Sequence, residues 1–392
     1  EIQQLIIRAE VPPDLVEAVR GAWSEIEREA GGPVTVALRS SAIGEDAAGS
    51  SFAGQYRSEL NVSAENVFDA YKDVLASKYS LAAISYRLNK GFRDEDVAMC
   101  VGGLVMVDAM AGGVTYTRNP VDIHDHGVFI NSSWGLPKAV VDGSDACDLF
   151  VVSRQEPMAL TREEIRVKER KFVCYPEEGV CRLDLTGEDK ALPSLTAAQA
   201  VELARLAVAI EAHYGVPQDI EWAIDPQGTI FLLQCRPLQQ KQAAEAEPPP
   251  DAHIPAPDSI LCRGGITASP GAACGPVFIA EKAADVLAFP EKGVLVIRQA
   301  QPRWASLLNR AAAVVSEQGG FAGHLANVAR EFGVPALFGV TDAARRLPAG
   351  QIVTVDASVQ SAIASLACLL SSSASTFGWS WNPSSTLNQT IS

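Results

Sequence analysis

A proline-rich stretch divides the sequence into two parts and limits how the chain can fold. Residues 239–258 contain five prolines together with Gln, Ala and Glu, and almost no large apolar side chain. This composition is typical of a linker, because it cannot bury enough apolar surface to form a core. If extended, it spans roughly 60 Å at about 3.1 Å per residue. We therefore expect two compact units that can swing relative to each other.

Length and charge favour a soluble multidomain protein and exclude some partners. The 392 residues exceed one ordinary core, and the net charge of −15 disfavours nucleic acid and anionic membranes, which attract basic surfaces. The eight cysteines lack Cys-x-x-Cys spacing, and no apolar run is long enough to span a bilayer. We expect a cytoplasmic protein with free thiols. Because the sequence starts at Glu1 without an initiator Met, we also expect a fragment of a longer protein.

Hydrophobic periodicity predicts alternating helices and strands in both units. Helices are expected over 11–30, 63–88 and 196–213, with Ser63 and Thr196 as N-caps. Strands of the first unit are expected at 34–38, 57–62, 97–107, 113–117, 127–131, 149–153 and 165–168, followed by a hairpin of 219–225 with 229–235. Strands of the second unit are expected at 276–280, 293–298, 312–316 and 351–356. Residues 371–392 carry no charged side chain and are predicted to be disordered.

One histidine lies on a glycine-rich loop where a helix is predicted to begin. The run Gly319-Gly320-Phe321-Ala322-Gly323 leads directly into His324. A helix N-terminus offers free N–H groups and a partial positive charge, which favour an anion such as a phosphoryl group carried on the histidine. A neutral imidazole is also a competent nucleophile towards phosphorus. By itself, the motif fits a structural histidine as well.

A second set of residues indicates a nucleotide site. Glu221 and Gln234 lie on the two strands of the predicted hairpin and can converge, and carboxylate and amide oxygens suit Mg²⁺ carrying ATP phosphates. Arg236 follows on the same strand face as Gln234, and Arg39 ends a predicted strand; both offer planar donor forks for phosphate. Phosphoryl transfer depends mainly on positioning the reacting groups and neutralising the negative charge of the phosphates. A bound metal ion and arginine side chains can do both. Asp225 is a looser metal candidate, because its place beside Pro226 favours a turn.

Several ordered motifs resemble the pyruvate, water dikinase (phosphoenolpyruvate synthase) family. In the first unit they are VALRSSAIGED at 36–46, SFAGQ at 51–55, GVTYTRNP at 113–120, SSWGL at 132–136, DIEW at 219–222 and QCRP at 234–237. In the second unit they are GITASPG at 265–271, the glycine-rich histidine motif at 319–324 and AREFGVP at 329–335. The resemblance covers about residues 30–360 and implies a mixed α/β and α+β multidomain fold.

The resemblance implies four segments. Residues 1–238 are an ATP-grasp-type nucleotide-binding domain whose N-terminal part is missing, and 239–260 are the linker. Residues 261–370 are a swivelling β/β/α phosphohistidine domain, and 371–392 are a disordered tail.

Roles for individual residues follow from the same resemblance. His324 is the phosphoryl carrier, Glu221 and Gln234 bind Mg²⁺, and Arg39 and Arg236 contact phosphates. Further contacts to ATP are implied for Gly54, Ser58 and Arg118.

The sequence departs from the family pattern near the expected site. Leu104 replaces a glutamine, Pro137-Lys138 replace Gly-Glu, and Ala322-Gly323 replace a threonine and a serine or cysteine. The early segment with a nucleotide-binding lysine and the C-terminal pyruvate-binding barrel are also not found.

The activity implied by the resemblance is transfer of a phosphoryl group from ATP to His324 and on to pyruvate, with AMP and phosphate as further products. The acceptor is expected on a further domain or a separate chain. Alternatives within the same chemistry are enzymes similar to pyruvate phosphate dikinase or rifampicin phosphotransferase. A different class of alternative is a degenerate, non-catalytic phosphocarrier module.

Overall fold

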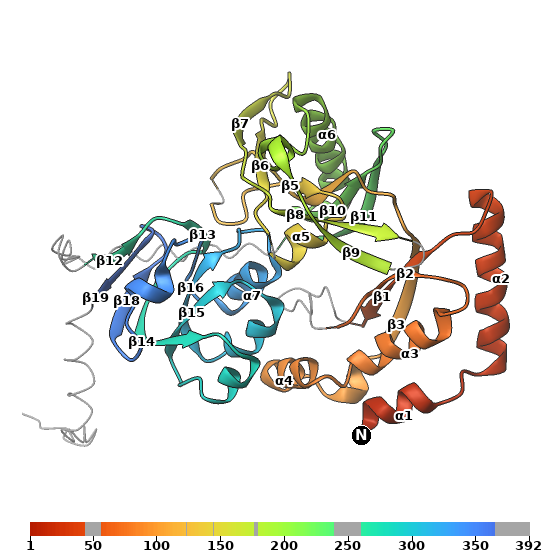
Figure 1. Ribbon diagram of the computed structural model, residues 1–392, viewed down its shortest axis with the longest axis horizontal. Coiled ribbons are helices and arrows are strands. Elements are labelled where there is room, and N and C mark those ends of the chain that lie inside the picture. Colours follow the sequence, from red (N-terminus) through yellow and green to blue (C-terminus); the bar gives the residue numbers. More distant parts are fainter. Residues whose placement is uncertain (44–55, 123, 144, 176–178, 239–259, 365–392) are drawn as a thin grey trace, which may run out of the picture.

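A computed structural model describes residues 1–43, 56–122, 124–143, 145–175, 179–238 and 260–364. Strands up to Pro237 pair only among themselves, and strands from Ile260 onwards do the same, among the described residues. The predicted linker and tail, and Gly54, lie outside the described residues. Figure 1 shows the first unit, in red to green, and the second, in cyan to blue, side by side, with α7 between them and close to α5.

The first unit begins with a small antiparallel sheet in the order β2-β1-β3. Its strands are β1 (Val36–Ala42), β2 (Glu59–Val62) and β3 (Met99–Val105), and its helices are α1 (Ile2–Arg8), α2 (Pro13–Ala30), α3 (Val67–Ser77) and α4 (Leu81–Lys90). Trp23 of α2, Leu38 of β1 and Val74 of α3 pack in one core. The sheet holds Arg39 on β1, with its guanidinium partly exposed.

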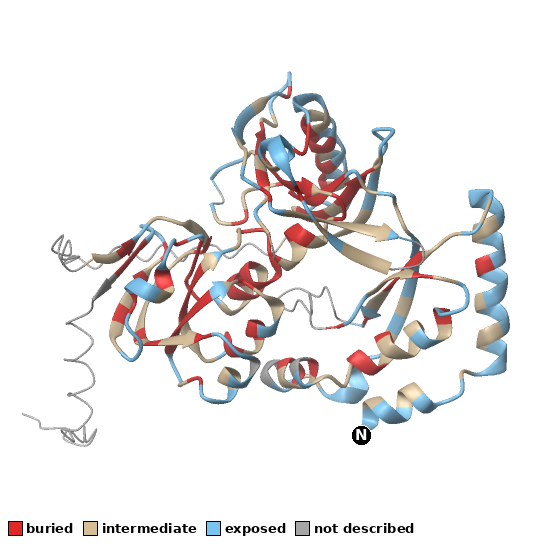
Figure 2. Cartoon of the chain, in the orientation of Figure 1, coloured by how far each residue is buried: buried red, intermediate tan, exposed pale blue. Residues whose placement is uncertain are grey.

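A six-stranded antiparallel sheet forms the rest of the first unit, in the order β11-β10-β4-β5-β6-β7. The strands are β4 (Ala111–Tyr116), β5 (Val128–Trp134), β6 (Asp148–Val152), β7 (Leu160–Glu164), β10 (Gln218–Ile224) and β11 (Ile230–Pro237). Helix α6 (Ala197–Tyr214) contacts β10, β4, β5 and β6, and the short α5 (Lys138–Asp142) contacts β4 and β5. A separate hairpin, β8 (Arg170–Tyr175) and β9 (Gly179–Asp184), lies beside β2. Figure 2 shows buried residues concentrated where α6 covers the sheet.

The second unit is a mixed eight-stranded sheet in the order β12-β19-β18-β14-β15-β16-β17-β13. Its strands are β12 (Ile260–Arg263), β13 (Ile266–Ser269), β14 (Ala272–Ala280), β15 (Gly293–Gln299), β16 (Ala311–Gln318), β17 (Ala336–Phe338), β18 (Ile352–Asp356) and β19 (Ser361–Ala364). Helices α7 (His324–Phe332) and α8 (Ala343–Arg346) complete it. Strand β15 places Leu295 and Ile297 in the core under α7 and Val294 and Val296 in the core under α8. A strand that is buried on both faces reads as a continuous apolar run, and β15 does.

Local signals predicted many of these elements. The hairpin β10–β11 and the N-cap of α6 are confirmed, since Thr196 and Gln199 form a capping box. The single helix expected over 63–88 with Ser63 as its N-cap is wrong. Helix α3 begins at Val67, after Asn66, and ends at Ser77, and Ser80 caps a new helix by accepting a hydrogen bond from Ala83 N–H at 3.1 Å. The strand expected at 165–168 is also wrong, because β7 ends at Glu164. The short strands β8, β9, β12, β13, β17 and β19 were not predicted.

Gly113 tests the pairing of β4 with β5. A Cβ on Gly113 would lie 1.9 Å from the carbonyl oxygen of Asn131, whereas a Cβ on Gly102 of β3 would meet nothing within 4 Å. Backbone cannot move away cheaply, so Gly113→Ala is expected to lower the free energy of unfolding by about 3 kcal/mol or more. Gly102→Ala is the matched control, with a change within about 0.5 kcal/mol. Denaturant unfolding of both variants checks this, and equal stabilities would contradict the pairing.

Candidate functional site

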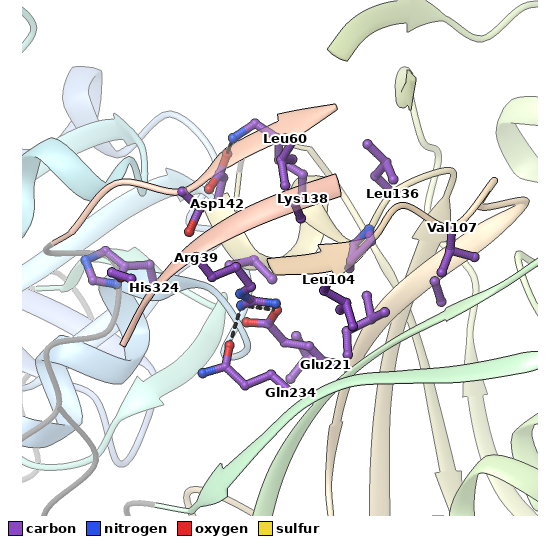
Figure 3. A pocket seen from close by; sticks show the side chains of 18 of the residues that line it. Arg39, Leu60, Leu104, Val107, Leu136, Lys138, Asp142, Glu221, Gln234 and His324 are labelled. Carbon is purple, nitrogen blue, oxygen red and sulfur yellow. Dashed lines mark hydrogen bonds and ion pairs between the residues drawn. The ribbon is translucent and has the colours of Figure 1, made fainter. Parts of the chain in front are cut away.

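A cavity of about 320 Å³ lies where the two sheets of the first unit face the N-terminus of α7. Four elements contribute its central polar side chains: Arg39 from β1, Glu221 from β10, Gln234 from β11 and His324 from α7. Figure 3 shows Arg39, Glu221 and Gln234 grouped together, with His324 to one side of them. The structure therefore brings together residues that lie nearly 300 positions apart.

The hairpin register places Glu221 directly opposite Gln234. Their oxygens converge on a single nitrogen: Arg39 Nη2 donates to Glu221 Oε2 at 2.9 Å and also to Gln234 Oε1. These two oxygens both bind one positively charged nitrogen. They are therefore of the right type, and close enough together, to bind a hard cation such as Mg²⁺. Among the described residues there is no cluster of three His, Cys, Asp or Glu side chains suited to a metal. A metal held here therefore needs phosphate or water oxygens to complete its coordination.

Two residues further along the hairpin, Arg236 forms a largely buried ion pair with Asp219. Arg236 donates to Asp219 Oδ2 through Nε at 2.9 Å and through Nη2 at 2.7 Å. Burial raises the pKa of the Asp219 carboxyl against the opposing effect of Arg236. Burial lowers the pKa of Arg236, but Asp219 and Glu221 outweigh it and the net direction is upward. The guanidinium is thus a fixed positive charge, oriented from behind by Asp219, at the wall of the cavity.

His324 is the first residue of α7 and reaches the same cavity. The residue is only 4% exposed, and its Nε2 has no hydrogen-bond partner among the described residues. Burial, helped by the positive charge of Arg236, lowers the pKa of His324 to about 4. The ring is therefore neutral near pH 7 and can offer a lone pair to the cavity. The glycine-rich loop lies beside the end of α5, since a Cβ on Gly323 would be in ordinary van der Waals contact with Gly143 Cα at 3.5 Å.

Apolar side chains line the other part of the cavity. Leu60, Leu104, Val107 and Leu136 lie on the far side of Arg39 and Glu221 from His324 in Figure 3. Lys138 also borders the cavity and is paired with Asp142 at 2.7 Å. The cavity thus runs from an apolar region, through a charged centre, to a histidine. An apolar region suits a base, and the charged centre suits phosphates.

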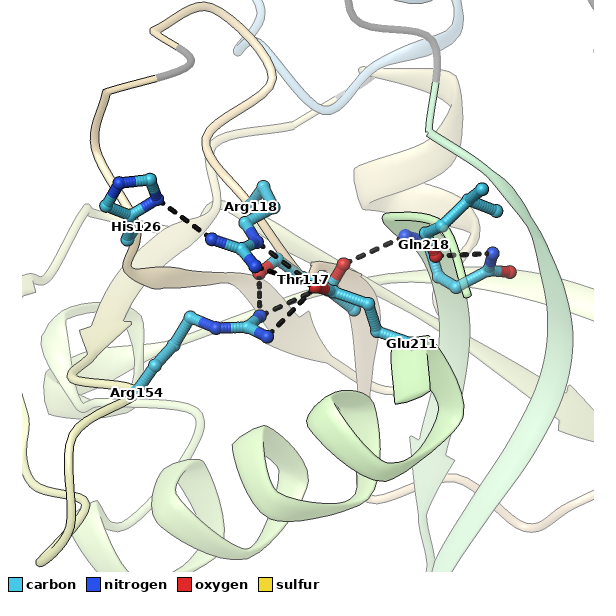
Figure 4. A network of polar contacts seen from close by, with 7 residues as sticks. Thr117, Arg118, His126, Arg154, Glu211 and Gln218 are labelled. Atoms are coloured by element: carbon cyan, nitrogen blue, oxygen red, sulfur yellow. Dashed lines mark hydrogen bonds and ion pairs between the residues drawn. The ribbon is translucent and has the colours of Figure 1, made fainter. Parts of the chain in front are cut away.

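Of the remaining predicted residues, Ser58 lines this cavity, and Arg118 does not. Arg118 lies in the polar network of Figure 4, where it and Arg154 both bond Glu211. His126 Nδ1 accepts a hydrogen bond from Arg118 Nη1 at 2.8 Å. The structure therefore places Arg118 apart from the other candidates.

Among the polar residues that sequence reasoning missed are Asp219 and Asn327, which line the cavity, and Tyr116, which bonds Asn327. Asp219 was present in a quoted motif, and its place opposite Arg236 in the hairpin register was a usable signal. Asn327 and Tyr116 gave no signal, because their contact joins residues 211 positions apart. Asp225 accepts from Thr229 N–H at 2.7 Å, which supports its turn role.

Comparisons with known proteins show the family of the chain. Residues 1–254 match the family described as pyruvate phosphate dikinase, AMP/ATP-binding domain, and residues 289–360 match the mobile domain of PEP-utilising enzymes. The phosphoenolpyruvate synthase of Aeropyrum pernix is 36% identical over 91% of this chain and 47% of its own length, and that of Escherichia coli is 35% identical over 91% and 46%. The chain spans about half the length of these relatives. A solved structure, aconitase X of Thermococcus kodakaraensis, overlaps 26% of the chain with a TM-score of 0.21, too low to bear on the fold.

None of the helices in the described part of the chain is both long and apolar enough to cross a membrane.

The buried imidazole makes stability depend on pH in a known direction. The folded pKa is about 4 and the ordinary value is 6.5, so between these pH values the unfolded chain binds more protons. Stability is therefore lost as the pH falls, by roughly 2–3 kcal/mol at pH 4.5 for this group. His324→Gln removes that contribution. Chemical denaturation of both proteins at pH 7 and 4.5 checks this; an equal loss of stability in the two would contradict a buried neutral ring.

Proposed function

The chain belongs to the pyruvate phosphate dikinase AMP/ATP-binding family, and from that premise we propose that it transfers a phosphoryl group from ATP to His324. The observation that carries the proposal is that His324, whose Nε2 is buried and has no hydrogen-bond partner among the described residues, lines the cavity that also holds Arg39, Glu221, Gln234 and Arg236. In the proposed arrangement the base of ATP occupies the apolar region and the phosphates extend over the arginines towards His324.

The chemistry begins with the neutral ring. The lone pair of Nε2 forms a bond to the β-phosphorus, while the bond from that phosphorus to the oxygen bridging it to the α-phosphorus breaks and its electron pair leaves with AMP. Water then attacks the γ-phosphorus and releases it as phosphate, so that one phosphoryl group remains on the ring. The ring proton remains on Nδ1. The low pKa of His324 keeps the lone pair available at neutral pH, and Arg236 stabilises the negative charge on the phosphoryl oxygens. Asp219 holds the Arg236 fork in place so that little reorganisation is needed.

Magnesium fits the converging oxygens of Glu221 and Gln234. When bound, Mg²⁺ supplies positive charge against the phosphates. In the described structure Arg39 Nη2 occupies the point between the two oxygens. We propose that Arg39 turns from these oxygens to the phosphates when Mg-ATP binds, which keeps each charge paired.

The final acceptor is proposed from the relatives. The named relatives are phosphoenolpyruvate synthases, so pyruvate is the proposed acceptor. The overall reaction is then ATP, pyruvate and water to AMP, phosphoenolpyruvate and phosphate. An enzyme similar to pyruvate phosphate dikinase is the alternative, in which orthophosphate takes the place of water; AMP formation that depends on added orthophosphate would indicate it.

His324 is tested directly by labelling. Incubation with Mg-ATP labelled on the β-phosphate is expected to give acid-labile label on the chain, and His324→Gln is expected to give none, because it has no nucleophilic nitrogen. His213→Gln, an exposed residue on the last turn of α6, is the matched control and keeps the label. Label that persists in His324→Gln would remove this residue from the reaction.

The metal proposal is tested on two carboxylates of the same hairpin. Glu221→Gln removes the charged ligand and is expected to raise the Mg²⁺ concentration for half-maximal labelling by at least about tenfold, since one charged contact is worth about 1.5–3 kcal/mol. Asp225→Asn makes the same chemical change in the turn after β10, outside the cavity, and keeps the acceptor for Thr229. A magnesium titration of labelling separates them. Equal titrations for both variants would contradict Mg²⁺ ligation by Glu221.

A further inference from the structure

Asn327 lies one helical turn beyond His324 and borders the same cavity. Its side-chain oxygen accepts two hydrogen bonds. Tyr116 Oη donates to Asn327 Oδ1 at 3.3 Å, and Arg330 Nη2 donates to the same oxygen. Tyr116 belongs to β4 of the first unit, whereas Asn327 and Arg330 belong to α7 of the second. The contact therefore joins the two units beside the candidate nucleophile.

These contacts fix which way the amide points. Arg330 can only donate, so the oxygen must face it, and the NH₂ group must face away. Among the described residues no acceptor bonds Asn327 Nδ2, and this nitrogen is not one of the buried atoms that lack a partner. Since the residue borders the cavity, its two N–H donors are available there. Residues three apart on a helix are neighbours, about 5–6 Å apart at Cβ, so an oxygen of a phosphoryl group on His324 lies within reach.

We propose that Asn327 is a phosphoryl-binding residue that donates an N–H to the group transferred to His324. Tyr116 is its positioning residue: it orients the amide only while the two units are in contact. This inference rests on the proposed function and adds a donor on the same helix as the nucleophile. A donor that travels with His324 can hold the phosphoryl group in the cavity and after the unit has moved, unlike Arg236, which belongs to the first unit.

The alternative role for Asn327 is a purely structural tie between the units. The docked surface has other contacts that could serve this purpose. Phe321 contacts Tyr116 and Phe129, with ring centroids 6.0 and 6.3 Å away. The single hydroxyl proton of Tyr116 is shared between Asn327 Oδ1 and Ala322 O, each 3.3 Å from Oη. Arg330 is held within the second unit by the carbonyls of Ala268 and Phe321, at 2.8 and 2.9 Å, so its position does not depend on the contact between the units. Both roles predict that deleting the side chain has some effect. The test must therefore distinguish the role of the side-chain oxygen as an acceptor from the role of the side-chain nitrogen as a donor.

Asn327→Asp makes this separation. It keeps the shape and an oxygen acceptor for Tyr116 and Arg330 but removes the N–H donors and adds a negative charge. Asn327→Ala removes the donors without adding charge. We expect both variants to phosphorylate His324 about 10–100-fold more slowly in a single turnover at saturating Mg-ATP, as for loss of a hydrogen bond to a charged group. Nucleotide affinity and the thermal midpoint of Asn327→Asp should match those of the unchanged protein. Tyr116→Phe should slow the step less, because the donors remain.

Other outcomes overturn the inference. If Asn327→Ala phosphorylates at the unchanged rate, the donors are not used, and a slow Asn327→Asp then reflects charge alone. If His324 of the Asn327→Asp variant is phosphorylated at the unchanged rate, Asn327 only links the two units. Failure of the proposed function is distinguishable, because the unchanged protein itself would then carry no label on His324.

Discussion

The antiparallel register of β10 with β11 is the constraint on which the site depends. It sets Glu221 opposite Gln234 and Asp219 opposite Arg236, so two polar pairs face one cavity. A slip of one residue would turn these side chains to the other face, where Trp222 and Ile224 pack against α6. The six-stranded sheet therefore fixes the register through its core, and the charged groups follow from it. The hydrogen bond from Arg39 to Glu221 then links the three-stranded sheet to the same cavity.

The second constraint is the contact between α7 and the first unit. Phe321, Ala322 and Tyr116 share one apolar cluster, and this burial excludes water from around His324. The same burial lowers the pKa of the ring and leaves Nε2 without a partner. An unsatisfied buried nitrogen costs free energy, which is acceptable where the nitrogen is to form a bond with a substrate. The contact between the units thus places His324 at the cavity and also lowers the pKa of its ring.

Sequence reasoning reached the parts of the fold that local chemistry determines. The Thr196 capping box, the β10–β11 hairpin and the glycine-rich start of α7 each depend on neighbouring residues, and each was predicted. The motifs also contain the central polar residues of the cavity, which are Arg39, Glu221, Gln234, Arg236 and His324. The break between α3 and α4 was missed because the apolar pattern continues across it, although Ser80 is a usable cap. The Tyr116–Asn327 contact could not be predicted, because it depends on how two separate units meet.

The central claim is that His324 Nε2 forms a bond to phosphorus inside this cavity. The most direct measurement is nitrogen NMR of the ¹⁵N-histidine-labelled chain mixed with Mg-ATP at neutral pH. The account predicts a one-bond coupling between ¹⁵N and ³¹P at the Nε2 of a single histidine, and its disappearance when His324 is replaced by glutamine. Formation of AMP without any phosphorus-coupled nitrogen, or coupling at a different histidine, would contradict it.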